Sequence, residues 1–188
     1  VLVHRAGAEN REDEVADELL AQVVDLNRAG AAGAGLAVHG RQLLALLVDA
    51  RRGEMVVDFC AGAGGKTLTL GAAMRNTGRL YAFDVSGHRL AALKRRLVRS
   101  GVSNVHPVQI AHERDDRIKR LAGKLDRVLV DAPCSGTGTW RRNPEGRWRL
   151  SPRELEKLGL LQARLLDIAA DLLRPGGGVA VVEQRVLE

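Results

Sequence analysis

The chain has 188 residues, and its 45% hydrophobic and 28% charged residues exclude a disordered or fibrous protein and suit one domain with a buried core. Its net charge of +6 and isoelectric point of about 10.0 favour a polyanionic partner. The two cysteines have no metal-type spacing, and the chain shows no signal peptide or membrane-spanning apolar run, so we expect a cytoplasmic protein that binds neither metal nor membrane.

The first part of the chain is predicted to be a helical segment followed by a linker. Residues 9–28 carry apolar side chains at helical spacing, after an acidic first turn that suits the helix dipole. Residues 30–35 consist only of alanine and glycine, as in a flexible linker. We therefore divide the chain into an N-terminal segment, residues 1–39, and a second domain, residues 40–188, which holds the motifs described below.

A glycine-rich turn follows the first predicted strand. The strand comprises residues 55–59, and a helix is expected to begin near Lys66. A nucleotide P-loop would need glycine at position 60, and a dinucleotide fingerprint would need it at position 67. The chain has Cys60 and Thr67 there, so phosphate binding is not favoured. The turn itself consists of Cys60, Ala61, Gly62, Ala63, Gly64 and Gly65.

An acid follows the second predicted strand, residues 79–83, at the sequence spacing expected for a ribose-binding residue. Asp84 follows the glycine turn by about twenty residues, where doubly wound folds place an acid that holds ribose hydroxyls. Alternatively, Asp84 caps the helix predicted for residues 86–100. That helix carries a run of basic residues, which is usually a solvated face but adds to the positive charge of the chain. A third strand is predicted at residues 105–110.

The most informative stretch follows the fourth predicted strand, residues 128–130. The apolar residues of this strand do not alternate with polar ones, as expected for a strand buried on both faces of a parallel sheet. Pro133 has no N–H for the ladder and ends the strand, and the glycines that follow let the backbone approach a ligand closely. Asp131 and Cys134 are thus predicted on a stiff turn at the carboxyl end of a strand, where open α/β sheets bind ligands.

A basic and aromatic patch lies between this turn and the last predicted helix. Arginine contacts phosphate and stacks on bases, and tryptophan stacks on unpaired bases. Because both tryptophans of the chain lie here, we predict RNA binding by Trp140, Arg141, Arg142, Arg147 and Trp148.

The remaining elements complete the predicted fold. Ser151 and Pro152 open a helix that runs to residue 173, a Pro-Gly turn follows at residues 175–178, and residues 179–182 form the last strand. The alternation of strands and helices predicts an α/β fold with a doubly wound, mostly parallel sheet.

Two long motifs resemble the Sun/Fmu family of RNA cytosine-C5 methyltransferases. They are residues 131–144, DAPCSGTGTWRRNP, and residues 58–67, DFCAGAGGKT, and the resemblance extends over about residues 40–178. It implies the Rossmann-like fold of class I methyltransferases that use S-adenosylmethionine (SAM), with a seven-stranded sheet whose last two strands this chain lacks. It also implies that residues 60–66 wrap the methionine part of SAM.

The resemblance implies transfer of a methyl group to C5 of a cytosine in RNA, ribosomal RNA in particular. Asp131 is implied to hold the cytosine edge beside the donor methyl, and Lys66 is a weaker candidate for a contact near the donor or the target. Related proteins place an acid near the adenine after the third strand, where this chain leaves the choice open between His112, Glu113 and Asp115.

The attacking cysteine of the family is absent. In the family it belongs to a Thr-Cys pair, whose position falls at Glu183 and Gln184 here, while a second cysteine, which matches Cys134, helps to release the product. Either Cys134 attacks, as its counterpart does in DNA cytosine-C5 methyltransferases, or the chain is an inactive SAM- or RNA-binding relative, or the sequence is incomplete. A methyltransferase acting on an exocyclic nitrogen is disfavoured by Cys134 and by the absence of an aromatic residue beside it.

Overall fold

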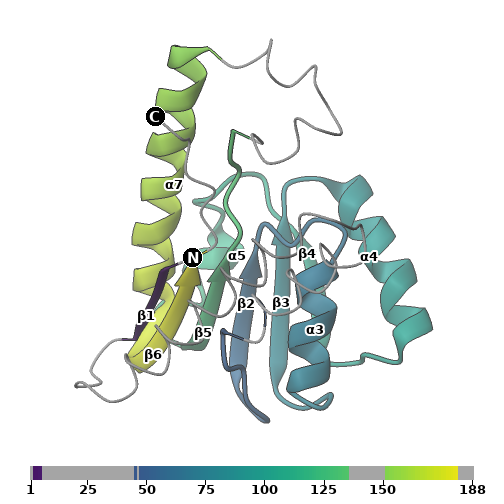
Figure 1. The fold of residues 1–188 in the computed structure, drawn as a ribbon. Helices are drawn as coiled ribbons and strands as arrows, with labels where there is room; N and C mark the ends of the chain where they lie inside the picture. Colours follow the sequence, from purple (N-terminus) through teal and green to yellow (C-terminus); the bar gives the residue numbers. More distant parts are fainter. Residues whose placement is uncertain (1, 6–44, 46, 136–150, 182–188) are drawn as a thin grey trace, which may run out of the picture.

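A single sheet forms the centre of the molecule (Figure 1). The computed structural model describes residues 2–5, 45, 47–135 and 151–181. The strand order is β1-β6-β5-β2-β3-β4; all neighbours run parallel except β1, which pairs antiparallel with β6. The strands are β1 (Leu2–Arg5), β2 (Met55–Phe59), β3 (Arg79–Asp84), β4 (Val105–Gln109), β5 (Leu125–Val130) and β6 (Leu173–Val181).

Helices cover both faces of this sheet (Figure 1). Because successive side chains of a strand point to opposite faces, β2 contributes to two cores. Val56 packs into one core, and Val57 packs into the other. The doubly wound α/β fold predicted from the sequence is therefore confirmed. The first core is covered by α3 (Gly65–Ala73) and α4 (Gly87–Ser100), and the second by α5 (Asp116–Lys119) and α7 (Pro152–Leu172).

The central strands are buried on both faces, which explains their uninterrupted apolar sequences. Val56, Val57, Leu129 and Val130 are completely buried. Burial of each such side chain contributes about 1.5–3 kcal/mol to the stability of the fold. Polar side chains are rare in this interior, and two acids, one in β2 and one in β3, lie near the carboxyl ends of their strands. They mark the edge where the site is built.

The last described strand begins earlier than the sequence predicts. β6 starts directly after α7, whereas we expected a turn over residues 175–178 before it. The Pro-Gly stretch instead forms an irregularity inside the strand: Leu125 of β5 pairs with Leu173, but Arg127 pairs with Gly178. The extra residues of β6 are accommodated by this irregularity, which proline and glycine permit as readily as a turn.

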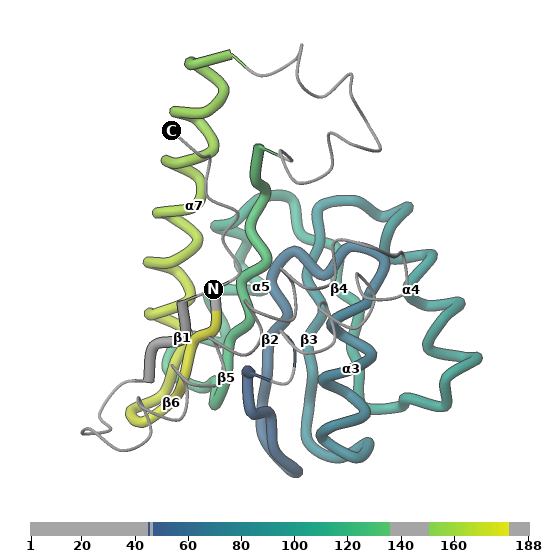
Figure 2. The backbone as a smooth tube through the Cα atoms, in the orientation of Figure 1, coloured from purple at the N-terminus to yellow at the C-terminus, as the bar shows by residue number. Residues whose placement is uncertain are grey.

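The strand β1 was not predicted from the sequence. Figure 1 shows it beside β6 at one edge of the sheet, where Leu2 pairs with Val181. The backbone tube in Figure 2 shows β6 next to β5 on its other side. Its four residues are too few to show a periodic pattern. The helical pattern over residues 9–28 lies outside the described residues, so the division of the chain at residue 39 stays a prediction.

Candidate active site

The glycine-rich turn forms a tight connection between β2 and α3. Its φ angles are positive at three residues: 69° at Cys60, 57° at Gly62 and 83° at Gly64. The amide of Gly64 donates to the carbonyl of Ala61 at 2.9 Å and closes the turn. A Cβ atom on Gly64 would lie 2.1 Å from Cδ1 of Leu93, so α4 leaves room only for glycine. The turn therefore brings backbone without bulky side chains to the carboxyl edge of the sheet.

Asp84 connects this turn to the end of β3. Its side chain is buried; Oδ2 accepts from the amide of Gly62 at 2.8 Å, and Oδ1 accepts from the amide of Ser86 at 2.7 Å. The N-cap of α4 is Ser86, whose hydroxyl accepts from the amide of Arg89. Capping α4 is thus the role of Ser86. Because each carboxylate oxygen has two lone pairs, Asp84 can still accept a hydrogen bond from a ligand.

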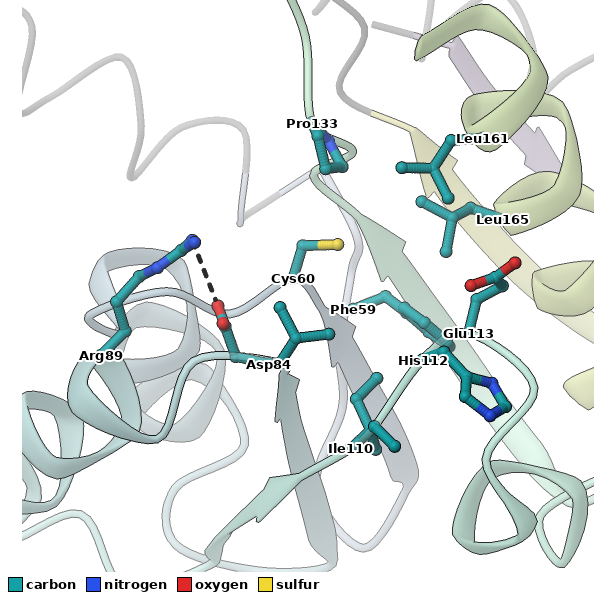
Figure 3. A pocket seen from close by; sticks show the side chains of 12 residues that line it. Phe59, Cys60, Asp84, Arg89, Ile110, His112, Glu113, Pro133, Leu161 and Leu165 are labelled. Carbon is teal, nitrogen blue, oxygen red and sulfur yellow. Dashed lines mark hydrogen bonds and ion pairs between the residues drawn. The ribbon is translucent and has the colours of Figure 1, made fainter. Parts of the chain in front are cut away.

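A pocket of about 290 Å³ opens beside Asp84 (Figure 3). Leu161 and Leu165 of α7 form one side of it, and Asp84 with Arg89 forms the other. Its walls combine apolar side chains with a few polar groups, as small-molecule sites do. The lining residues are Phe59, Cys60, Asp84, Val85, Arg89, Ile110, Ala111, His112, Glu113, Pro133, Leu161 and Leu165.

Most of this lining was not predicted as part of a site. Phe59 and Ile110 end or follow strands, so their position at the carboxyl edge was available as a signal. Leu161 and Leu165 come from a helix far along the chain, and a leucine that lines a pocket has the same spacing as one in the core. Only the packing of α7 on the sheet reveals their place.

The structure distinguishes between His112, Glu113 and Asp115, the three candidates after β4 for the residue near the adenine. Asp115 does not line the pocket. It is the N-cap of α5, and its carboxylate accepts two backbone hydrogen bonds of 3.0 and 2.9 Å. These hydrogen bonds lower the pKa of Asp115. His112 and Glu113 both line the pocket, and Glu113 also pairs with Arg164 of α7 at 3.3 Å. Of the two acids, Glu113 is therefore the one that a ligand in the pocket can reach.

Lys66 and Asp131 form an ion pair between the two sequence motifs. Nζ of Lys66 lies 2.5 Å from Oδ2 of Asp131, and the two side chains are 12% and 36% exposed. The amide of Asp131 also donates to the carbonyl of Phe59 at 3.2 Å, which holds the start of the turn after β5 against β2. The fold thus brings the end of β5 next to the glycine-rich turn.

Two ionisable groups near the turn have raised pKa values. Burial raises the pKa of Asp58, which is 1% exposed, to about 7, although the hydroxyl of Thr67 donates to its Oδ2 at 2.6 Å. Burial also raises the pKa of the Cys60 thiol to about 12, with further contributions from nearby carboxylates. Since the thiolate is the reactive form, Cys60 is unreactive at neutral pH. Asp58 and Thr67 are the first and last residues of the motif at residues 58–67, but the sequence analysis assigned neither of them a role in the site.

Cys134 lies half-buried on the turn after β5. The carbonyl of the preceding residue, Pro133, accepts a hydrogen bond of 2.9 Å from Nε2 of Gln162 on α7. With the bond from Asp131 to Phe59, the backbone that leads to Cys134 is held by both β2 and α7.

Several predicted residues lie outside the described part of the chain. Within the described part, no group of three or more His, Cys, Asp or Glu side chains is placed to hold a metal ion. None of the described helices has the length and apolar character needed to cross a membrane. The predicted residues that lie outside the described part of the chain are Trp140, Arg141, Arg142, Arg147, Trp148, Glu183 and Gln184.

The fold and the site together define a class of protein. A parallel sheet in the order β4-β3-β2-β5-β6, with a glycine-rich turn after β2 and an acid at the end of β3, is the Rossmann-like fold of SAM-dependent methyltransferases. A family model described as 16S rRNA methyltransferase RsmB/F matches residues 45–182. The chain therefore belongs to the RsmB/F family, which confirms the resemblance found in its two motifs.

Individual relatives agree with this assignment. Ribosomal RNA small subunit methyltransferase F of Shewanella amazonensis is 38% identical over 135 residues, which cover 71% of this chain and 28% of that protein. Methyltransferase B of Thermus thermophilus is 36% identical over 133 residues, with coverages of 71% and 31%. The crystal structure of NSun6 from Pyrococcus horikoshii with SFG has a TM-score of 0.64 and 28% identity, over 73% of this chain and 34% of that one. The chain thus spans less than a third of the length of these two curated relatives.

Proposed function

We propose that the protein transfers a methyl group from SAM to C5 of a cytosine in RNA. The proposed substrate is ribosomal RNA, which the names of its relatives mention. The observation that carries the proposal is the contact between the two motifs, in which Nζ of Lys66 and Oδ2 of Asp131 are 2.5 Å apart. A cofactor held by residues 60–66 and a base held at Asp131 and Cys134 then meet at one edge of the sheet. A cytoplasmic location belongs to the same proposal.

The residues of the pocket fit SAM. The apolar walls suit an adenine ring, and Asp84 can accept from ribose hydroxyls while it holds the glycine-rich turn. A Cβ atom on Gly62 or Gly65 would meet no protein atom within 4 Å, so open space remains beside the backbone for the methionine part. When bound there, SAM supplies an electrophilic methyl group.

The chemistry requires a thiolate, because C5 of cytosine is a poor nucleophile. Addition of the thiolate to C6 forms a carbon–sulfur bond and makes C5 enamine-like, so that C5 can take the methyl group. A base then removes the proton from C5, and the carbon–sulfur bond breaks. Lys66 binds Oδ2 of Asp131, which leaves Oδ1 to accept a hydrogen bond from the exocyclic amine of the cytosine. The target base must leave any stack to reach this edge.

Cys134 is the thiol that we assign to the attack. The chain has two cysteines, and the raised pKa of Cys60 removes that thiol as a nucleophile. The presence of Glu183 and Gln184 where the family has Thr-Cys favours a second candidate function, a relative that binds SAM and RNA without turnover.

Trapping with a fluorinated base tests these alternatives. In RNA that carries 5-fluorocytosine, C5 has no proton to lose after methyl transfer, so the covalent adduct persists. We expect wild type with SAM to form an adduct on the peptide that contains Cys134, and Cys134→Ser to form none. A folded protein that binds both S-adenosylhomocysteine and RNA but traps nothing would support the second candidate. An adduct that survives Cys134→Ser would contradict the assignment of the nucleophile.

A further inference from the structure

The outer face of α4 carries positive charge only. The 14 residues of this helix, GHRLAALKRRLVRS, include five lysines and arginines and no acid. Leu90 and Leu93 are buried against the sheet. Lys94, Arg95 and Arg99 are exposed on the other side, and we call these three residues the α4 basic face. Among the described residues, no carboxylate forms an ion pair with any of the three.

The other two cations of α4 connect the helix to the candidate active site. Arg89 lies 3.5 Å from Oδ2 of Asp84, and Arg96 donates to the carbonyl of Ala63 in the glycine-rich turn at 2.8 Å. Arg89 also lines the pocket. The α4 basic face is therefore carried by a helix that is fixed to the cofactor turn.

The charge of α4 differs from that of an ordinary solvated helix. The long helix α7 carries three basic and four acidic residues in the sequence PRELEKLGLLQARLLDIAADL. Such mixing stabilises a helix, because opposite charges three or four residues apart attract and like charges repel. Arg95 and Arg99 are four residues apart and repel each other. A polyanion bound to this face would relieve the repulsion.

We propose that the α4 basic face binds the phosphate backbone of the substrate RNA beside the modified base. This inference rests on the proposed function. The helix has no Phe, Tyr or Trp, so it has no aromatic ring on which a base could stack. Its Lys and Arg side chains contact phosphates regardless of the base sequence. The three side chains of the α4 basic face span about 8 Å along the helix axis, so the contact covers two or three neighbouring phosphates beside the flipped cytosine.

The test compares two triple variants of equal charge. Lys94→Ala, Arg95→Ala and Arg99→Ala remove the α4 basic face, and alanine keeps the helix stable. The control, Lys119→Ala, Arg120→Ala and Lys124→Ala, removes three exposed cations from α5 and the turn after it, on the opposite face of the sheet.

Each phosphate contact contributes about 0.7–0.9 to the slope of log K against log salt. We therefore expect the α4 variant to lower the slope by about 2–3. The ratio of its RNA affinity to that of wild type should then be about 20–40 times smaller at 50 mM salt than at 200 mM salt. The loss should be equal for RNAs of unrelated sequence. Binding of S-adenosylhomocysteine should be unchanged in both variants.

The outcomes distinguish this inference from the function on which it rests. If wild type binds no RNA, both are overturned. If wild type binds RNA and the α4 variant keeps the wild-type slope, the inference is overturned while the proposed function stands, and residues 140–149 become the main RNA contact. If the control lowers the slope as much as the α4 variant does, net charge rather than α4 controls binding, which also overturns the inference.

Discussion

Asp84 shows how one carboxylate can serve both the fold and a ligand. Both of its oxygens accept backbone hydrogen bonds, one from Gly62 and one from Ser86, and the same side chain lines the pocket. A group held so firmly is preorganised to accept hydrogen bonds from ribose hydroxyls, because its orientation is already fixed before the ligand arrives.

Asp84→Asn tests this role while keeping the size of the side chain. The variant loses the negative charge, so we expect binding of S-adenosylhomocysteine to weaken by about 1–3 kcal/mol, the cost of losing hydrogen bonds to a charged group. Isothermal titration calorimetry measures the difference. Asp116→Asn, at an acid outside the pocket, serves as the control and should bind like wild type. Equal affinities for all three proteins would remove Asp84 from the binding site.

Asp58 makes the stability of the fold depend on pH. Its pKa is about 7 in the folded protein against an ordinary value of 3.8, so between these values the folded state holds a proton that the unfolded chain has released. The stability from this group is therefore fully present below about pH 4 and is lost as the pH rises through 7. Asp58→Asn is neutral at every pH and has nearly the same shape.

We expect the free energy of unfolding of wild type to fall by a few kcal/mol more than that of Asp58→Asn between pH 4 and pH 7. Urea unfolding at several pH values measures both curves. Because every other group titrates in both proteins, their difference isolates Asp58. Parallel curves would show that Asp58 is ionised in the folded protein.

At the scale of elements, local patterns predicted the strands and helices that hold the site. The strand β2 has the predicted bounds, and α4 begins one residue after the predicted start, Ser86, which is its N-cap. An apolar run or a capping residue marks each of these elements, and both are local features of the sequence. The predicted site residues that the structure describes, from Cys60 to Cys134, lie at the carboxyl edge of the sheet, on turns, at the end of β3 or at the start of α3.

The remaining features depend on tertiary packing and could not be predicted locally. The irregular start of β6 is set by its pairing with β5, since proline and glycine are compatible with either a turn or a bulge. The raised pKa of Asp58 follows from the burial of its side chain inside the fold. The part of the pocket formed by Leu161 and Leu165 exists only because α7 packs against β5 and β6.

The turn before α3 offers a matched pair of substitutions. Gly64→Ala combines a φ of 83° with a clash, because the new Cβ would lie 2.1 Å from Leu93. Gly62→Ala has a φ of 57° but no protein atom within 4 Å. We expect Gly62→Ala to lower the free energy of unfolding by about 1–2 kcal/mol, from backbone strain alone. Gly64→Ala should cost about 1–3 kcal/mol more, from overpacking.

Urea unfolding measures both glycine variants. The double variant Gly64→Ala, Leu93→Ala provides the decisive comparison, because Leu93→Ala should cost less in the Gly64→Ala background than in wild type. Additive effects would mean that α4 moves away freely and that Leu93 does not restrict the turn.

At the scale of the whole molecule, α7 connects the cofactor pocket to the turn that carries Cys134. Leu161 and Leu165 line the pocket, and Gln162, on the same helical turn, donates to the carbonyl of Pro133. On the opposite face of the sheet, α4 is tied to the glycine-rich turn through Arg96. The site is therefore fixed from both faces, and α7 is positioned to hold the pocket wall and the catalytic turn together.

Gln162→Leu tests whether α7 holds this turn. The variant keeps the helix but removes the hydrogen bond to Pro133, which is worth about 0.5–1.5 kcal/mol, so we expect the turn to open about 2–12 times more often. The amide of Asp131, which donates to the carbonyl of Phe59, should then exchange with deuterium faster by the same factor. Arg164→Leu, two residues further along α7, removes the pair with Glu113 and should leave this exchange unchanged. If the Asp131 amide exchanges at the wild-type rate in Gln162→Leu, the turn is held by β2 alone, and α7 serves only as a wall of the pocket.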